Sequence, residues 1–159
     1  MSNYSKSQAR NERYEELCQR GFDLIQSRSS KEALSYLEQA LKIKSDDYKA
    51  FRYQGLALCK VGRFEKALSS YDKALEIKPD CYEVWSDRGY TLYVLGRCEE
   101  AFVSYYKALE VKPDYFEAQE KQELFLKEYQ QTGKNIKYPL FFKTLFASLR
   151  PFFKSFLLR

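Results

Sequence analysis

The strongest constraint on the fold of this chain is a motif that returns every 34 residues. The stretch YDKALEIKPD at residues 71–80 recurs as YYKALEVKPD at 105–114, and in weaker form as LEQALKIKSD at 37–46. Small and apolar residues recur at the same spacing, which predicts an array of similar stacked units. The recurring positions include Gly21, Gly55 and Gly89; Ala33, Ala67 and Ala101; and Leu24, Leu58 and Leu92.

Each copy of the motif has the pattern of two helices joined by a short turn. Apolar residues occur at helical spacing over two stretches of about 12 to 14 residues each. Pro79 and Pro113 cannot continue a helix, and we expect Asp80 and Asp114 to accept hydrogen bonds from the start of the next one. The chain has 6 glycines and 4 prolines, which also favours an all-α fold.

These residues closely resemble the tetratricopeptide repeat, whose signature spans 34 residues. The resemblance implies a right-handed helix-turn-helix solenoid. We place the copies at residues 14–47, 48–81 and 82–115, which together make a repeat region of 14–115. In the third copy the signature positions are Trp85, Gly89, Leu92, Ala101, Tyr105, Ala108 and Pro113.

The chain departs from the signature in three ways, the first of which is Ser45 in place of the proline in the first copy. Arg28 stands in the first copy where the other turns have Gly62 and Gly96, so we expect a less regular connection there. A polar residue precedes the central glycine of every copy, where the signature has leucine; these residues are Arg20, Gln54 and Arg88.

Three segments flank the repeats. Residues 1–13 are expected to be a polar arm. Residues 116–133 have the pattern of one amphipathic capping helix that covers the last apolar face. Residues 134–159 are a basic, phenylalanine-rich tail that contains six basic residues and no acid, so residues 1–128 carry about −1 of the formal charge of +5 and the tail +6.

The tail is predicted to be an amphipathic helix, kinked near Pro151. A membrane span is disfavoured, since three charges at about +2.5 to +3.5 kcal/mol each outweigh apolar residues at about −0.3 to −0.6. Its apolar face consists of Phe141, Phe142, Leu145, Phe146, Leu149, Phe152, Phe153, Phe156 and Leu157. The basic residues Lys143, Arg150 and Lys154 lie beside that face.

The sequence offers no catalytic chemistry. It contains no histidine, which removes the commonest general base and metal ligand, and it has no glycine-rich phosphate loop. The four cysteines show neither close CxxC pairs nor zinc-site spacing, so we interpret them as reduced thiols. We therefore expect no enzyme activity, no metal and no cofactor.

The resemblance implies that the first helix of each copy lines a concave groove that holds a partner segment. Projecting these helices by their period gives candidate residues for an aromatic groove with acidic edges. The candidates are Phe22, Ile25, Arg52, Leu56, Cys59, Tyr90, Tyr93 and Leu124.

Some members of the family bind the C-terminal carboxylate of chaperones through lysine, asparagine and arginine side chains. The matching positions here lack that set, and two of them are acidic, which disfavours a co-chaperone role. They hold Cys18, Phe22, Tyr53, Glu83 and Asp87. The groove suits a basic amphipathic segment better.

The sequence therefore predicts a non-catalytic protein–protein interaction module, a scaffold or adaptor that binds a peptide or helix. The tail is expected to dock on the repeats, in its own or a second molecule, or on a partner. The alternative is an adaptor anchored peripherally by the tail on an anionic membrane surface. Nucleic acid is disfavoured, since the repeats have no basic stripe. We expect a cytoplasmic protein, or one peripheral to a membrane.

Overall fold

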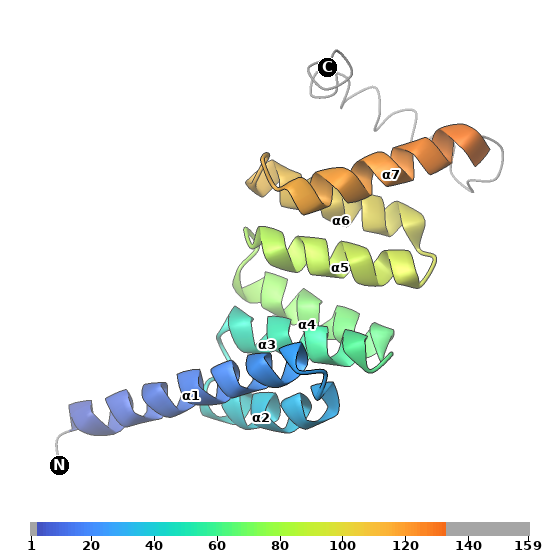
Figure 1. The fold of residues 1–159 in the computed structure, drawn as a ribbon. Coiled ribbons are helices and arrows are strands. Elements are labelled where there is room, and N and C mark those ends of the chain that lie inside the picture. Colours follow the sequence, from blue (N-terminus) through green and yellow to red (C-terminus); the bar gives the residue numbers. More distant parts are fainter. Residues whose placement is uncertain (1–2, 133–159) are drawn as a thin grey trace. The chain divides into compact units, whose positions relative to one another are not determined.

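The computed structural model describes residues 3–132 (Figure 1), and every regular element in this range is an α-helix. The chain divides into two compact units, Met1–Glu123 and Leu124–Arg159, and the second is described only over residues 124–132. The helices are α1 (Asn3–Gln26), α2 (Ser30–Ile43), α3 (Tyr48–Lys60), α4 (Phe64–Ile77), α5 (Tyr82–Val94), α6 (Cys98–Val111) and α7 (Phe116–Thr132).

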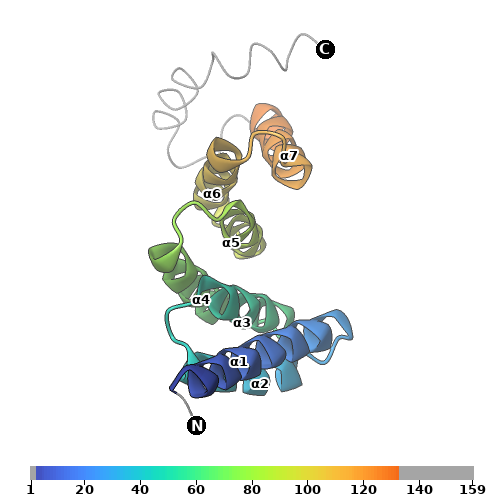
Figure 2. The same cartoon turned by 90° about the vertical axis from the view of Figure 1, so that its left-hand side faces the viewer.

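Helices α1 to α6 form three helical hairpins in the first unit. α1 packs against α2, α3 against α4 and α5 against α6, and the second helix of a hairpin also contacts the first helix of the next. Figures 1 and 2 both show these hairpins stacked in chain order. The predicted all-α helix-turn-helix solenoid is confirmed. Residues 3–13, expected as a polar arm, are helical and begin α1, where the Arg10 guanidinium donates hydrogen bonds to the Ile43 carbonyl.

The turns within the three hairpins share one backbone geometry. Arg28 has a φ of 64°, close to the 78° of Gly62 and the 72° of Gly96. The following residue closes each turn onto the preceding helix with hydrogen bonds from Ser29 N to Leu24 O, Arg63 N to Leu58 O and Arg97 N to Leu92 O. The expectation of a less regular first connection was wrong: an arginine can occupy the left-handed region, at a cost of about 1–2 kcal/mol, when the surrounding bonds are kept.

The helices of each hairpin approach most closely at the central glycine. The ring of Tyr105 crosses Gly89, and a Cβ at that glycine would lie 2.9 Å from ring atom Cε1. Tyr71 covers Gly55 and Leu37 covers Gly21 in the same way. Buried alanines on the second helices, such as Ala67 and Ala74, complete these contacts. The recurring small residues are therefore the places where large side chains of the facing helix fit.

Two of the polar residues before the central glycines, Gln54 and Arg88, connect neighbouring helices. The Ser70 hydroxyl donates to the Gln54 side chain at 3.0 Å. Arg88 donates to the Ser104 hydroxyl at 2.8 Å and to the Asp72 carboxylate at 2.9 Å, so it joins α5 both to α6 and to α4. Hydrogen bonds at these positions replace the apolar contact that leucine makes in the signature.

Helix capping differs in part from the sequence prediction. Asp47 caps α3, because its carboxylate accepts the N–H of Lys49 at 2.9 Å. The residue before α5 is Cys81, whose side chain makes no such cap. The predicted cap at Asp80 is therefore wrong, since the N-cap position is one residue further along the chain.

Candidate functional site

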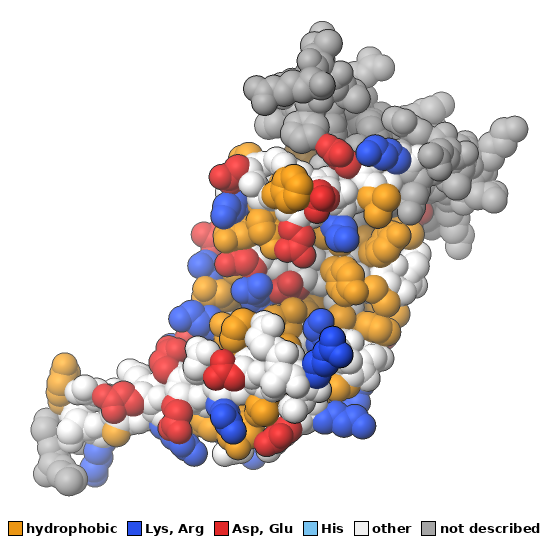
Figure 3. Space-filling view, viewed as in Figure 1, with side chains coloured by type: hydrophobic (Ala, Val, Ile, Leu, Met, Phe, Trp, Pro, Cys, Tyr) orange, Lys and Arg blue, Asp and Glu red, His pale blue; other side chains and the backbone are white. Residues whose placement is uncertain are grey.

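The candidate site lies on the first helices of the second and third hairpins, α3 and α5, and on residues 116–123 of α7. Helical spacing puts residues 83, 87, 90 and 94 on one side of α5. Over α5, Figure 3 shows acidic side chains near the middle of the view and hydrophobic side chains gathered to their right. We call this surface the inner face; it consists of Arg52, Leu56, Glu83, Asp87, Tyr90, Tyr93, Val94 and Glu117.

Exposed apolar side chains lie near the end of α5. Tyr90 is 50% exposed, Tyr93 36% and Val94 43%. The two tyrosines were predicted from the sequence; Val94 was not, although the same helical spacing indicates it. Large apolar groups clustered on a protein surface mark places where other molecules bind.

The predicted groove residues on α1 and α3 are less accessible. Phe22 is half-buried against Tyr53, with 5.0 Å between the ring centroids. Leu56 is half-buried beside the core cluster that contains Ile25, which is only 6% exposed. Cys59 is half-buried and lies 3.6 Å from the Thr91 hydroxyl. Because Ile25 belongs to the core, we leave it out of the inner face.

Leu124 is the remaining predicted groove residue. It is exposed on α7 and belongs to the second unit. The tail residues, both apolar and basic, lie outside the described part of the chain, and so does the predicted end of the capping helix at Gly133.

An ion pair joins the two central helices of the inner face. The Arg52 guanidinium donates to the Asp87 carboxylate at 2.7 Å, and both side chains are about one-fifth to one-quarter exposed, at 24% and 20%. Burial, together with the charges of Glu117 and Glu83, raises the pKa of the Asp87 carboxyl to about 6 despite Arg52. The pair therefore leaves negative charge around Asp87 that is incompletely balanced.

The hydroxyl of Tyr105 lies under this surface. Tyr105 is 3% exposed, and its hydroxyl has no hydrogen-bond partner among the described residues. Burial raises the pKa of this phenol, and the Glu117 charge raises it further. From the sequence, Tyr105 was predicted only as a signature position of the repeat. Its spacing of 34 from Tyr71 indicates the fold but not the missing partner.

The cysteines form no reactive or metal-binding group in the described residues. None of the four forms a disulfide bond within the described residues. Burial raises the pKa of Cys18, Cys59 and Cys81, which makes their reactive thiolate forms scarcer. No group of three or more potential metal ligands lies within residues 3–132. In the same range, no helix is both long and apolar enough to cross a membrane.

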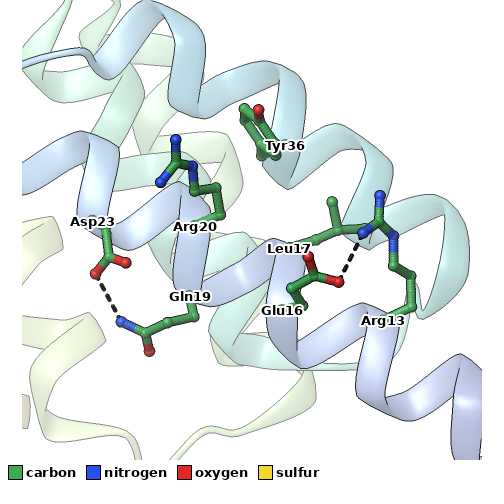
Figure 4. A pocket seen from close by; sticks show the side chains of 7 residues that line it. All are labelled: Arg13, Glu16, Leu17, Gln19, Arg20, Asp23 and Tyr36. Atoms are coloured by element: carbon green, nitrogen blue, oxygen red, sulfur yellow. Dashed lines mark hydrogen bonds and ion pairs between the residues drawn. The ribbon is translucent and has the colours of Figure 1, made fainter.

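A pocket lies between α1 and α2 (Figure 4), outside the inner face. Its polar side chains largely pair with one another: Arg13 with Glu16 at 2.7 Å and Gln19 with Asp23 at 2.8 Å. Arg20 lies beside Tyr36 (Figure 4). This pattern is typical of a solvated helix surface, and we assign no function to the pocket.

Comparisons with known proteins agree on the fold. Residues 48–81 match the model of the tetratricopeptide repeat (TPR) family. A sequence comparison with curated proteins found no match.

Several solved structures are similar. The TPR domain of Sgt2 from Aspergillus fumigatus has a TM-score of 0.72 at 18% identity, covering 77% of this chain and 82% of that chain. The first TPR of Spaghetti (RPAP3), bound to the HSP90 peptide SRMEEVD, has a TM-score of 0.71 at 19% identity, covering 75% and 94%. YrrB, a TPR protein with an unusual peptide-binding site, has a TM-score of 0.66 at 24% identity, covering 69% and 57%. The described part of this chain thus has the fold of a tetratricopeptide-repeat domain, and residues 48–81 match the repeat model of that family.

Proposed function

We propose that this protein is a non-catalytic interaction module, a scaffold or adaptor that binds a peptide or helix of a partner protein on the inner face. The observation that carries the proposal is the exposed apolar group of Tyr90, Tyr93 and Val94 beside the Arg52–Asp87 ion pair. Apolar anchors next to charged groups are the usual composition of a protein-binding surface. Similar folds that bind peptides, such as the RPAP3 domain with its HSP90 peptide, support the same reading.

The test is affinity capture with a double variant of the inner face, Leu56→Glu with Tyr90→Glu. We expect loss of partner proteins with an almost unchanged helical circular dichroism signal. The matched control is Ile77→Glu with Val111→Glu, which alters two exposed apolar residues on the second helices α4 and α6. Because Leu56 is half-buried, Tyr90→Glu with Tyr93→Glu is measured in parallel. Equal recovery of partners by all the variants would contradict the proposal.

A co-chaperone role is the less favoured alternative. Glu83, Asp87 and Glu117 would repel the carboxylate-rich end of a chaperone tail, and Arg52 is already paired with Asp87. We expect no saturable binding of the peptide SRMEEVD in calorimetry. Binding that is abolished by Arg52→Ala would establish the co-chaperone role instead.

For residues 134–159, we propose docking on the repeats or on a partner, supported by the tail's charge of +6 against about −1 for residues 1–128. Peripheral attachment to an anionic membrane is the alternative, supported by basic residues beside a phenylalanine-rich face. Truncation after Gly133 should change thermal stability, oligomeric state or partner affinity if the tail docks on protein. Flotation of the intact protein with anionic vesicles would favour the membrane alternative.

A further inference from the structure

We propose that the inner face contains a site for one cationic side chain, a lysine or arginine of the bound partner segment. The site consists of the carboxylates of Asp87 and Glu117, the hydroxyl of Tyr105 and the rings of Tyr90 and Tyr93. We call these five residues the cation site. The inference rests on the proposed function and adds the chemical group that the inner face selects.

The first support is an excess of negative charge. Asp87 faces three charged groups, the Arg52 guanidinium at 2.7 Å and the carboxylates of Glu83 and Glu117, so only one of the three is a cation. The Tyr115 hydroxyl donates to Glu117 at 2.8 Å, which satisfies one oxygen but brings no charge. A further cation would therefore gain from carboxylates that are only partly compensated.

The second support is independent of these charges. Tyr105 is buried, and among the described residues nothing hydrogen-bonds its hydroxyl. Its ring crosses Gly89, and its hydroxyl is within electrostatic reach of Glu117, Tyr90, Tyr93 and Asp87. A buried hydroxyl without a partner is unfavourable and uncommon in folded proteins. An ammonium or guanidinium held at the cation site would donate to it once the side chains that cover the hydroxyl move aside.

The preceding copy shows how the same hydroxyl is normally satisfied. Tyr71 occupies the equivalent position 34 residues earlier, and its hydroxyl is hydrogen-bonded to Thr91 on the next hairpin. The residue 34 positions after Thr91 in the sequence is Phe125, which has no polar side-chain atom. The sequence therefore has no hydroxyl at the position that would correspond to Thr91 for Tyr105.

The aromatic residues supply the remaining part of the site. Tyr90 and Tyr93 are three positions apart on α5, so they lie on neighbouring parts of its surface, and both are exposed. Tyrosine rings attract a lysine ammonium or an arginine guanidinium and also pack against its aliphatic stem. This combination favours a cationic side chain over a small inorganic cation.

The test is calorimetric titration of the full-length protein with two capped peptides. The first is LKKLLKLLKKLLKL, and the second has glutamine in place of every lysine. We expect the lysine peptide to bind at least about tenfold more tightly, as charge-assisted hydrogen bonds imply. The difference should shrink as the salt concentration rises.

Variants of the carboxylates and of the hydroxyl separate the parts of the site. Asp87→Asn with Glu117→Gln should reduce the affinity for the lysine peptide to that for the glutamine peptide. Tyr105→Phe should reduce the affinity for the lysine peptide by about threefold to tenfold. It should also raise Tm, because a buried unpaired hydroxyl is removed. The matched control Tyr71→Phe, which removes a hydroxyl that has a partner, should lower Tm and leave both affinities unchanged.

The failure of this inference is distinct from failure of the proposed function. If the two peptides bind with equal affinity and Tyr90→Glu abolishes the binding of both, the cation site is overturned. The proposed interaction module is then still supported. Unchanged lysine-peptide affinity in Tyr105→Phe and in the carboxylate variant also overturns the cation site, as does the absence of binding by either peptide. Binding that is insensitive to Tyr90→Glu contradicts the inner face as the binding surface.

Discussion

The ammonium nitrogen of Lys112 lies 4.6 Å from the centre of the Tyr82 ring. The same contact joins Lys78 to Tyr48 at 4.7 Å and Lys44 to Tyr14 at 5.2 Å, so it recurs in all three hairpins. In each hairpin, the lysine follows the second helix and the tyrosine lies on the first. The lysine of the repeated KPD or KSD motif thus joins the end of the second helix to the first helix, opposite the turn of the hairpin.

Loss of this contact should destabilise the third hairpin. We expect Lys112→Met, which keeps the length of the side chain, to lower the free energy of unfolding by about 0.5–1 kcal/mol, the usual size of a cation–π interaction near a surface. Urea denaturation followed by circular dichroism measures this change. The control is Lys66→Met on the exposed side of α4. An equal effect of the two substitutions would show that the ring contact contributes nothing.

The first turn can be relieved of backbone strain. Arg28 has a φ of 64°, a conformation that glycine adopts without strain and other residues rarely adopt. We expect Arg28→Gly to raise the free energy of unfolding by up to about 1 kcal/mol, the left-handed penalty less the entropy that glycine loses on folding. Gly62→Arg in the second hairpin should have the opposite sign. Destabilisation by Arg28→Gly would contradict this account.

The contact between Gly89 and Tyr105 leaves no room for a methyl group. We expect Gly89→Ala to destabilise the protein by about 1–3 kcal/mol, because the new Cβ would push the buried ring out of place. Thermal unfolding measures the effect. Gly96→Ala provides the comparison, since its Cβ would meet no atom and only its φ of 72° resists the change. A stable Gly89→Ala variant would show that the hairpin can open at this point.

The Asp87 carboxyl should make stability depend on pH. Burial raises its folded-state pKa to about 6, above the value near 3.9 expected for an unfolded chain. The folded state therefore binds the proton more tightly. The stability that this group contributes is fully present below about pH 4 and is lost as the pH rises to about 6.

The charged groups that act on the Asp87 carboxyl are Arg52, Glu83 and Glu117. The titratable side chains of Cys59, Tyr71, Tyr105 and Tyr115 also lie within electrostatic reach of it. NMR titration of the Asp87 carboxyl carbon should give a midpoint near pH 6. The difference in Tm between acidic and neutral pH should be smaller in Asp87→Asn than in the unmodified protein. In the control Asp72→Asn, this difference should be unchanged. A midpoint at or below 3.9, the reference value for aspartate, would contradict the raised pKa.

Much of the fold could be predicted because its determinants recur locally. Gly55 and Tyr71, for example, belong to one copy and meet when its two helices fold back on each other. The same contact recurs between Gly89 and Tyr105. Because the determinants recur, the hairpins and their stacking can be predicted from a single sequence. The conformation of the first turn was not predicted correctly. The hydrogen bonds around Arg28 determine its backbone conformation more than its residue type does.

The repeat period by itself determined the helices, the hairpins and the side of each first helix that turns toward its neighbours. Only the tertiary structure decided which of those side chains stay accessible. Ile25 and Tyr93 share a repeat position but differ in burial, because the helices beside them carry different side chains. Likewise, the Arg52–Asp87 pair forms between two copies, and the Tyr105 hydroxyl is buried without a partner among the described residues. Periodicity specifies backbone geometry, whereas burial and pairing depend on the individual residues that the folded copies bring together.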